Sequence, residues 1–120
     1  MYSVKADVAK NRLYITLEGF FKVEEMKACT DLTISESKKL RPGFDVITDV
    51  SQFKPADPET TKEIERAQAF FTAAKIGRGV RVVGQKVTGG MQLTRTGKSV
   101  GYEPVTVATM AEAEKLRFRN

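Results

Sequence analysis

The sequence predicts an α/β fold: a single domain over residues 1–120, with a mainly parallel five-stranded sheet and about four helices. Three observations predict it. Two alternating segments open the chain, apolar runs rich in β-branched residues then alternate with segments of helical periodicity, and glycine or proline separates most of them. The resulting order, β-β-α-β-α-β-α-β-α, requires crossover connections that place helices on the faces of the sheet. A chain of 120 residues is long enough for one hydrophobic core and too short for two.

The opening segments predict a β-hairpin. Tyr2–Val8 and Leu13–Leu17 both alternate between apolar and polar side chains, and the second is rich in β-branched and aromatic residues. Lys10 and Asn11 lie between them as a short turn. Gly19 ends the second strand, because glycine lets the chain turn out of the sheet.

A first helix is predicted over Val23–Leu40. Its apolar and small polar residues recur at helical spacing: Met26, Cys29 or Thr30, Thr33, Ser37 and Leu40. Glu24 and Glu25 suit the positive end of the helix dipole. Arg41–Gly43 contains a proline and a glycine, which stop the helix and reverse the chain.

The later elements follow from a buried run and a capping signal. Phe44–Val50 is a mostly apolar run, typical of a strand that is buried on both faces. Asp57 supplies a helix N-cap, Pro58 the first helical position and Glu59 an acid in the first turn. The elements that follow are a helix from Asp57 to about Gly77 or Gly79, a strand over Gly79–Gly84, a helix over Met91–Val100, a strand over Pro104–Ala108 and a helix over Met110–Leu116.

Two loops are predicted to form the working rim of this fold. In open parallel sheets, ligands and partners meet the loops beyond the carboxyl ends of the strands, which here are Asp49–Glu59 and Gln85–Thr94. The candidate partner-binding residues in and beside the first loop are Asp49, Ser51, Phe53, Lys54, Asp57, Glu59, Thr60 and Thr61. Phe20-Phe21 and Phe70-Phe71 are each expected to divide between core and surface, and an exposed member of either pair would suit a protein interface.

The second loop is rich in glycine and cationic. Its candidate ligand-binding residues are Gln85, Lys86, Thr88, Gly89, Gly90 and Arg95. Between a strand and a helix, such glycines let backbone N–H groups face an anion, for example a carboxylate, a phosphate or a lipid headgroup. The alternative is that Thr88 caps the next helix and the two glycines only reverse the chain.

The composition excludes several classes of active site. The chain has no histidine and one cysteine, Cys29, so Ser-His-Asp triads, Cys-His dyads and histidine-ligated metals are all excluded. Cys29 falls on the apolar side of its helix and is expected to be a core residue. We therefore expect no cofactor and no metal, and an enzyme is the least favoured class. The single thiol and the absence of a secretory pattern in the first residues predict a reduced, cytoplasmic location.

The net charge of +5 is concentrated in one segment. Lys75–Tyr102 holds six cationic residues and no acid, whereas the rest of the chain holds 14 cationic and 15 acidic residues. Tyr102 is the only aromatic residue of that segment, which therefore lacks the stacking side chains that single-strand binders interleave with charge. This pattern argues against nucleic-acid binding, and no apolar stretch approaches the roughly 18 residues of a membrane span. A homodimer fits a domain of this size, although no feature requires one.

Two short motifs accompany this order of elements. One is the strand segment Pro42–Ser51, and the other is the closing segment with Gly101-Tyr102 and Met110–Ala113. Together they resemble the STAS superfamily, and more narrowly its SpoIIAA-like branch, over almost the whole chain. The resemblance implies the predicted fold and a non-enzymatic regulatory role like that of anti-sigma factor antagonists, exerted by binding a protein partner.

One feature of the antagonists is missing from this sequence. In them, the third strand ends in an Asp-Leu-Ser-like segment and the next helix opens with Asp-Ser-Ser-Gly, whose serine is phosphorylated by a partner kinase. An ungapped match places Asp49–Ser51 on the first motif and Asp57 on the aspartate of the second. Pro58 and Glu59 occupy the two serine positions and Thr60 the glycine position, so the phosphorylatable pair is absent. Glu59 either stands in permanently for the phosphorylated residue or simply complements the helix dipole.

Two functional hypotheses follow. The first is a regulatory module that binds a protein through Asp49–Thr61, and the alternative is a small-ligand or lipid-binding domain that uses the basic loop Gln85–Thr94. An apolar concavity with Lys86 or Arg95 at its mouth would favour a ligand, and a flat or convex rim would favour a protein.

Overall fold

One mixed sheet of five strands, in the order β1-β2-β3-β4-β5, organises the fold. The computed structural model describes residues 1–54, 56–84, 101 and 104–115. Its strands are β1 (Tyr2–Asp7), β2 (Arg12–Gly19), β3 (Asp45–Phe53), β4 (Gly79–Val82) and β5 (Val105–Val107). The hairpin strands β1 and β2 pair antiparallel, and the pairings of β2 with β3, β3 with β4 and β4 with β5 are parallel. The prediction of an α/β fold is confirmed.

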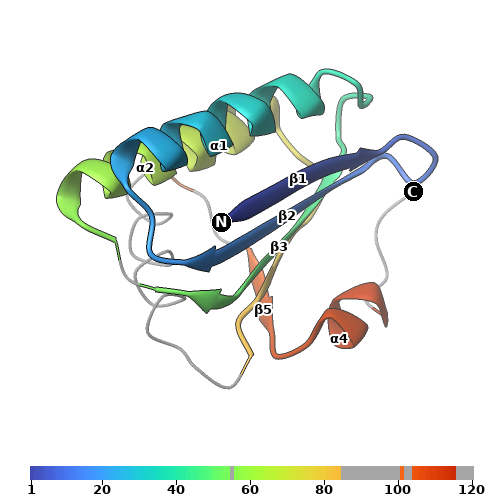
Figure 1. The fold of residues 1–120 in the computed structure, drawn as a ribbon. Coiled ribbons are helices and arrows are strands. Elements are labelled where there is room, and N and C mark those ends of the chain that lie inside the picture. The colour runs from blue at the N-terminus through green and yellow to red at the C-terminus, as the bar shows by residue number, and fades with distance from the viewer. Residues whose placement is uncertain (55, 85–100, 102–103, 116–120) are drawn as a thin grey trace.

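Helices cover both faces of this sheet. Within the described residues they are α1 (Val23–Ser37), α2 (Pro58–Ala74) and α4 (Met110–Lys115). Figure 1 shows α1 and α2 together on one face and α4 on the opposite face. The predicted helix Met91–Val100 lies outside the described residues, so the structure establishes three helices and not the predicted four.

The central strands have different bounds from those predicted, and the difference changes where site residues lie. β3 extends beyond Val50 to Phe53, because its parallel pairing with β2 resumes after an irregularity near the end of β2. β4 ends at Val82 and not at Gly84, which adopts a positive φ of 66° and turns the chain away from the strand direction. The end of β3 therefore belongs to the sheet and not to the loop.

Both long helices end earlier than predicted. α1 ends at Ser37 and not at Leu40, because the next residues make tighter bonds to the third residue back, such as Leu40 N to Ser37 O at 3.1 Å. α2 ends at Ala74, ahead of the predicted glycines. Lys75 follows it in the left-handed conformation (φ 53°) that closes many helices.

The main hydrophobic core lies between the sheet and the pair α1 and α2. Its buried residues come from β2, β3, both helices and the segments beside them: Leu13, Ile15, Leu17, Phe21, Met26, Cys29, Phe44, Val46, Val50, Phe53, Ile64 and Phe71. The expectation that Cys29 is a core residue is confirmed, and burial raises the pKa of its thiol to about 11. A smaller core on the opposite face joins Ile47, Val80, Val82 and Ala113 under α4.

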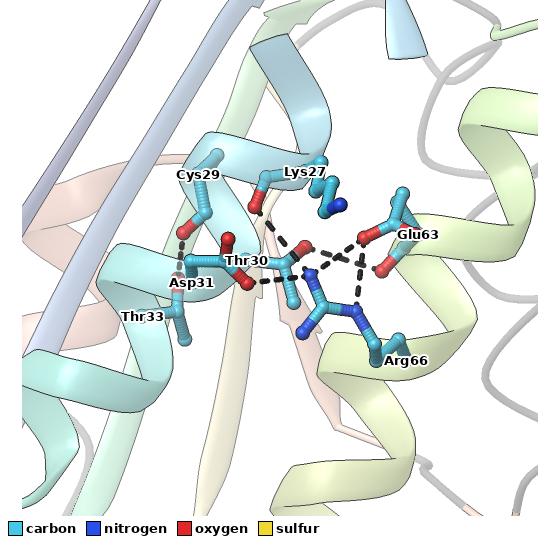
Figure 2. Close-up of polar contacts among 7 residues, drawn as sticks. All are labelled: Lys27, Cys29, Thr30, Asp31, Thr33, Glu63 and Arg66. Atoms are coloured by element: carbon cyan, nitrogen blue, oxygen red, sulfur yellow. Dashed lines mark hydrogen bonds and ion pairs between the residues drawn. The ribbon is translucent and has the colours of Figure 1, made fainter. Parts of the chain in front are cut away.

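Buried hydroxyl groups on α1 are satisfied by backbone carbonyls. Thr33 Oγ1 donates to Cys29 O at 2.9 Å, and Ser37 Oγ donates to Thr33 O at 2.7 Å, each one helical turn back. Thr30 Oγ1 crosses to the second helix and donates to Glu63 O at 3.2 Å (Figure 2). These bonds explain how small polar residues fill the buried face of α1 without leaving unpaired groups.

Arg66 forms ion pairs that link the two long helices, α1 and α2, at their exposed side. Its guanidinium reaches from α2 to Asp31 of α1 at 2.8 Å and also holds Glu63 of its own helix at 2.7 Å (Figure 2). Hydrogen bonds to these two carboxylates raise the pKa of Arg66. Because the side chains are partly exposed, such a pair contributes at most about 1 kcal/mol. Helix packing therefore depends on the core beneath.

Candidate functional site

The loops that follow β2 and β3 meet at the carboxyl edge of the sheet. Gly19 pairs with Phe53 at the end of the two strands, and Lys54 N donates to Gly19 O at 3.1 Å. This contact places Phe20 beside the first predicted loop. Phe20 is 74% exposed, whereas Phe21 is buried and packs against Phe53 with ring centroids 5.8 Å apart. The predicted division of this pair between core and surface is confirmed.

The first turn of α2 lies just beyond Lys54 in the chain. Asp57 caps the helix as predicted, since its Oδ1 accepts a hydrogen bond from Thr60 N at 2.8 Å. Thr61 Oγ1 donates to Asp57 O at 2.8 Å and closes the same turn. Asp57, Pro58 and Glu59 are all exposed. Hydrogen bonds from Thr60 to the Asp57 carboxylate lower its pKa below the ordinary aspartate value.

The lowered pKa of Asp57 predicts a specific dependence of stability on pH. Its contribution is present above the ordinary aspartate value of 3.8 and is lost as the pH falls through the lowered value. Asp57→Asn keeps a capping side chain without the charge. We therefore expect thermal melting to show a lower midpoint for Asp57→Asn than for the unmodified protein at pH 7, with the difference narrowing towards pH 2. An equal difference at both pH values would contradict this assignment.

Two predicted rim residues are not available to a partner. Phe53 is only 6% exposed and Thr60 is fully buried, so both face the core instead of the rim. The prediction assigns Phe53 to the loop because it ends β3 at Val50, whereas β3 continues to Phe53. Thr60 faces inward because it lies on the buried side of the first turn of α2. These two assignments are corrected. Thr61 remains half-buried.

We call the exposed residues that remain in and beside these loops the outer rim. It consists of Phe20, Lys54, Asp57 and Glu59. Phe20 was not among the rim residues predicted from the loops, and the signal that pointed to it was the Phe20-Phe21 doublet. Only the pairing of the strands decides which member is exposed, because successive residues beyond the strand end can face either way.

Asp49 and Ser51 lie apart from the outer rim. Both are on β3 and line an open depression of about 410 Å³ on the α4 side of the sheet. Its other lining residues are Gln52 from β3, Val82 and Gly84 from the end of β4, and Ala108, Thr109 and Met110 at the start of α4. The structure thus divides the predicted first site into two neighbouring parts, an exposed rim and a half-buried depression.

An internal cavity lies between the sheet and the helices α1 and α2. It measures about 50 Å³ and is lined mainly by core residues, with the buried Arg81 at one wall. Ligand pockets are commonly several hundred Å³ in volume. The cavity is therefore too small to hold a lipid chain.

The second predicted loop, with Gln85, Lys86, Thr88, Gly89, Gly90 and Arg95, lies outside the described residues. Across the part of the chain that the structure describes, no group of three or more His, Cys, Asp or Glu side chains is arranged to hold a metal ion. The helices described there are also too short or too polar to cross a membrane.

A scan against models of protein families finds no match for this chain, and a search of the curated proteins finds no matching relative. Function is therefore inferred from the residues of the chain and their geometry.

Proposed function

We propose that this protein is a non-enzymatic regulatory module that binds a protein partner through the outer rim, in the manner of the STAS antagonists that its sequence resembles. The observation that carries the proposal is Phe20, an aromatic ring 74% exposed next to Gly19, whose carbonyl accepts a hydrogen bond from Lys54 N at the start of the loop that leads to α2. A ring in water is unfavourable by about 25 cal/mol for each Å² of apolar surface, and association with a partner would remove that surface from water. The position at the carboxyl edge of parallel strands is where α/β proteins usually present their sites.

The charges around Phe20 support a protein partner. Lys54 in the loop after β3 and the acids Asp57 and Glu59 at the start of α2 give the outer rim exposed charges of both signs. Protein interfaces commonly combine a central aromatic anchor with a polar, charged surround. Such a surround excludes water from the anchor and selects partners of complementary charge.

The first turn of α2 also bears on regulation. Pro58 and Glu59 leave no hydroxyl group at the two positions of the serine pair, one of which is phosphorylated in the antagonists. We therefore propose that partner binding is not controlled by phosphorylation there. The cavity in the main core, at about 50 Å³, is too small for a lipid chain. The loop Gln85–Thr94, which the ligand-binding alternative would use, lies outside the described residues.

Phe20→Ser is expected to reduce the amount of retained partner at least about tenfold in a native pull-down followed by mass spectrometry, as loss of an interface anchor does. Val8→Ser is the matched control. Val8 is also an exposed apolar residue, at 57%, but lies in the hairpin turn at the opposite end of β2. Both substitutions are at exposed positions, so both variants should stay folded. Retention of the same proteins by Phe20→Ser as by Val8→Ser would refute the outer rim as the binding surface.

A further inference from the structure

We propose that the depression beside Asp49 and Ser51 is a binding site for a cationic hydrogen-bond donor, an ammonium or guanidinium group. It is distinct from the outer rim and does not depend on the protein-binding proposal. The occupant would place its charge against the Asp49 carboxylate. Four observations support it.

The first observation is the fixed position of the Asp49 carboxylate. Asp49 Oδ1 accepts two hydrogen bonds from Ser51, from the backbone N at 3.0 Å and from Oγ at 2.7 Å. Such a double contact holds the side chain in one orientation. A preoriented carboxylate loses less conformational freedom when it binds a ligand than a mobile one does.

The second observation is the direction of the hydrogen bonds at Asp49 and Ser51, which form the β3 wall of the depression. Ser51 Oγ gives its proton to Asp49, so the hydroxyl presents only lone pairs to the depression. Asp49 Oδ2 accepts no hydrogen bond from the described residues and also presents lone pairs. Both groups can therefore accept hydrogen bonds but not donate them. A ligand that donates several hydrogen bonds is complementary to this wall, and one that only accepts them is not.

The third observation is that the described residues supply no counter-charge to Asp49. Asp49 is half-buried, yet it forms no ion pair with any of the described residues. Withdrawing a carboxylate from water costs free energy unless a cation or several donors replace the water. The two hydrogen bonds from Ser51 are both accepted by Oδ1 of Asp49 and none by its Oδ2. An ammonium or guanidinium group would supply the missing charge and the missing donors together.

The fourth observation is the space in front of the carboxylate. The depression measures about 410 Å³, which lies within the usual range of roughly 300–1,000 Å³ for ligand sites. Gly84 lies close to Ser51 at the β4 side of the depression, because a Cβ atom there would lie 2.9 Å from Ser51 Cβ. The half-buried Met110 adds apolar surface that would contact the methylene groups of a long amine.

The ammonium or guanidinium group could belong to a lysine or arginine side chain of a protein, or to a free polyamine. The first probes are butylammonium and ethylguanidinium, which reproduce the ends of those side chains, with butyrate as an anion of similar size. They are titrated into the ¹⁵N-labelled protein at neutral pH and low ionic strength. We expect both cations to cause saturable shifts of the amide signals of Ser51, Gly84 and Thr109, and butyrate to cause none.

Asp49→Asn keeps the shape of the side chain and removes its charge. It is expected to weaken binding of either cation at least about tenfold, because a charge-assisted hydrogen bond is lost. Glu24→Gln removes one negative charge from an exposed position at the start of α1, on the face of the sheet opposite the depression, and should leave binding unchanged. Ser51→Ala keeps the Asp49 charge, so it should weaken binding less than Asp49→Asn does.

Three results would overturn the proposal: no saturable shift with either cation, equal shifts with butyrate, or undiminished binding by a folded Asp49→Asn variant. If Asp49→Asn does not fold, the titrations of the unmodified protein with the two cations and with butyrate still test whether the depression binds cations selectively. The source is then resolved by comparing blocked Gly-Lys-Gly and Gly-Arg-Gly peptides with spermidine. Tighter binding of a peptide indicates a side chain of a partner, and tighter binding of spermidine indicates a free polyamine.

Discussion

Phe53→Ala is expected to lower the free energy of unfolding by about 3–5 kcal/mol, as removal of a buried aromatic ring does. Phe53 is 6% exposed at the end of β3, and its ring packs against Phe21 in the main core. Truncation removes apolar burial and leaves a cavity at the carboxyl edge of the sheet. Urea denaturation followed by circular dichroism measures the change through the midpoint and slope of the transition.

Phe20→Ala is the matched control for this prediction. It removes the same side chain from a neighbouring position, but Phe20 is 74% exposed. Its effect on the free energy of unfolding should therefore lie within about 0.5 kcal/mol. Equal losses for the two variants, or the larger loss for Phe20→Ala, would contradict the assignment of Phe53 to the core and Phe20 to the surface.

Gly84→Ala is expected to lower the free energy of unfolding by about 2–4 kcal/mol. Two effects combine at this position. Gly84 has a φ of +66°, which an alanine adopts only with strain, and the added Cβ would lie 2.9 Å from Ser51 Cβ. Ser51 would have to move, and its hydrogen bond of 2.7 Å to Asp49 would be disturbed. The same variant should therefore bind the cationic probes more weakly.

Gly19→Ala separates the two effects. Gly19 has a similar φ of +76°, but an added Cβ meets no atom within 4 Å. This control should show only the conformational strain, about 1–2 kcal/mol. Thermal and urea denaturation of both variants measure the difference. If Gly19→Ala and Gly84→Ala lose the same stability, then the close approach of Gly84 to Ser51 does not matter energetically.

Local signals in the sequence were sufficient for much of the fold. The hairpin, the α/β order and the cap at Asp57 depend on neighbouring residues, and helical spacing placed Cys29 in the core. The end of β3 was missed because it depends on pairing with β2, a strand far away in the sequence. The prediction that Phe53 and Thr60 are rim residues was wrong for a similar reason. Burial depends on which distant residues pack against a side chain, and local sequence does not show this.

The candidate site was predictable only in part. Asp49 and Ser51 were found because they lie at the end of a buried strand that precedes a capped helix. The depression in front of these two residues could not be predicted, because the fold brings Thr109 and Met110 beside β3 from the other end of the chain. Ser51 donates its hydroxyl proton to Asp49, so the two side chains can only accept hydrogen bonds from a ligand. This direction could be known only from the side-chain geometry.

The central claim is that the outer rim meets a protein partner, and photo-crosslinking tests it most directly. Benzoylphenylalanine replaces Phe20 in one protein and Val8 in another, and both are irradiated under native conditions in the organism that makes the protein. Both positions are exposed, and they lie at opposite ends of β2. We predict a discrete crosslinked protein species from position 20 and none of that size from position 8. The same species from both positions, or none from position 20, would contradict the claim.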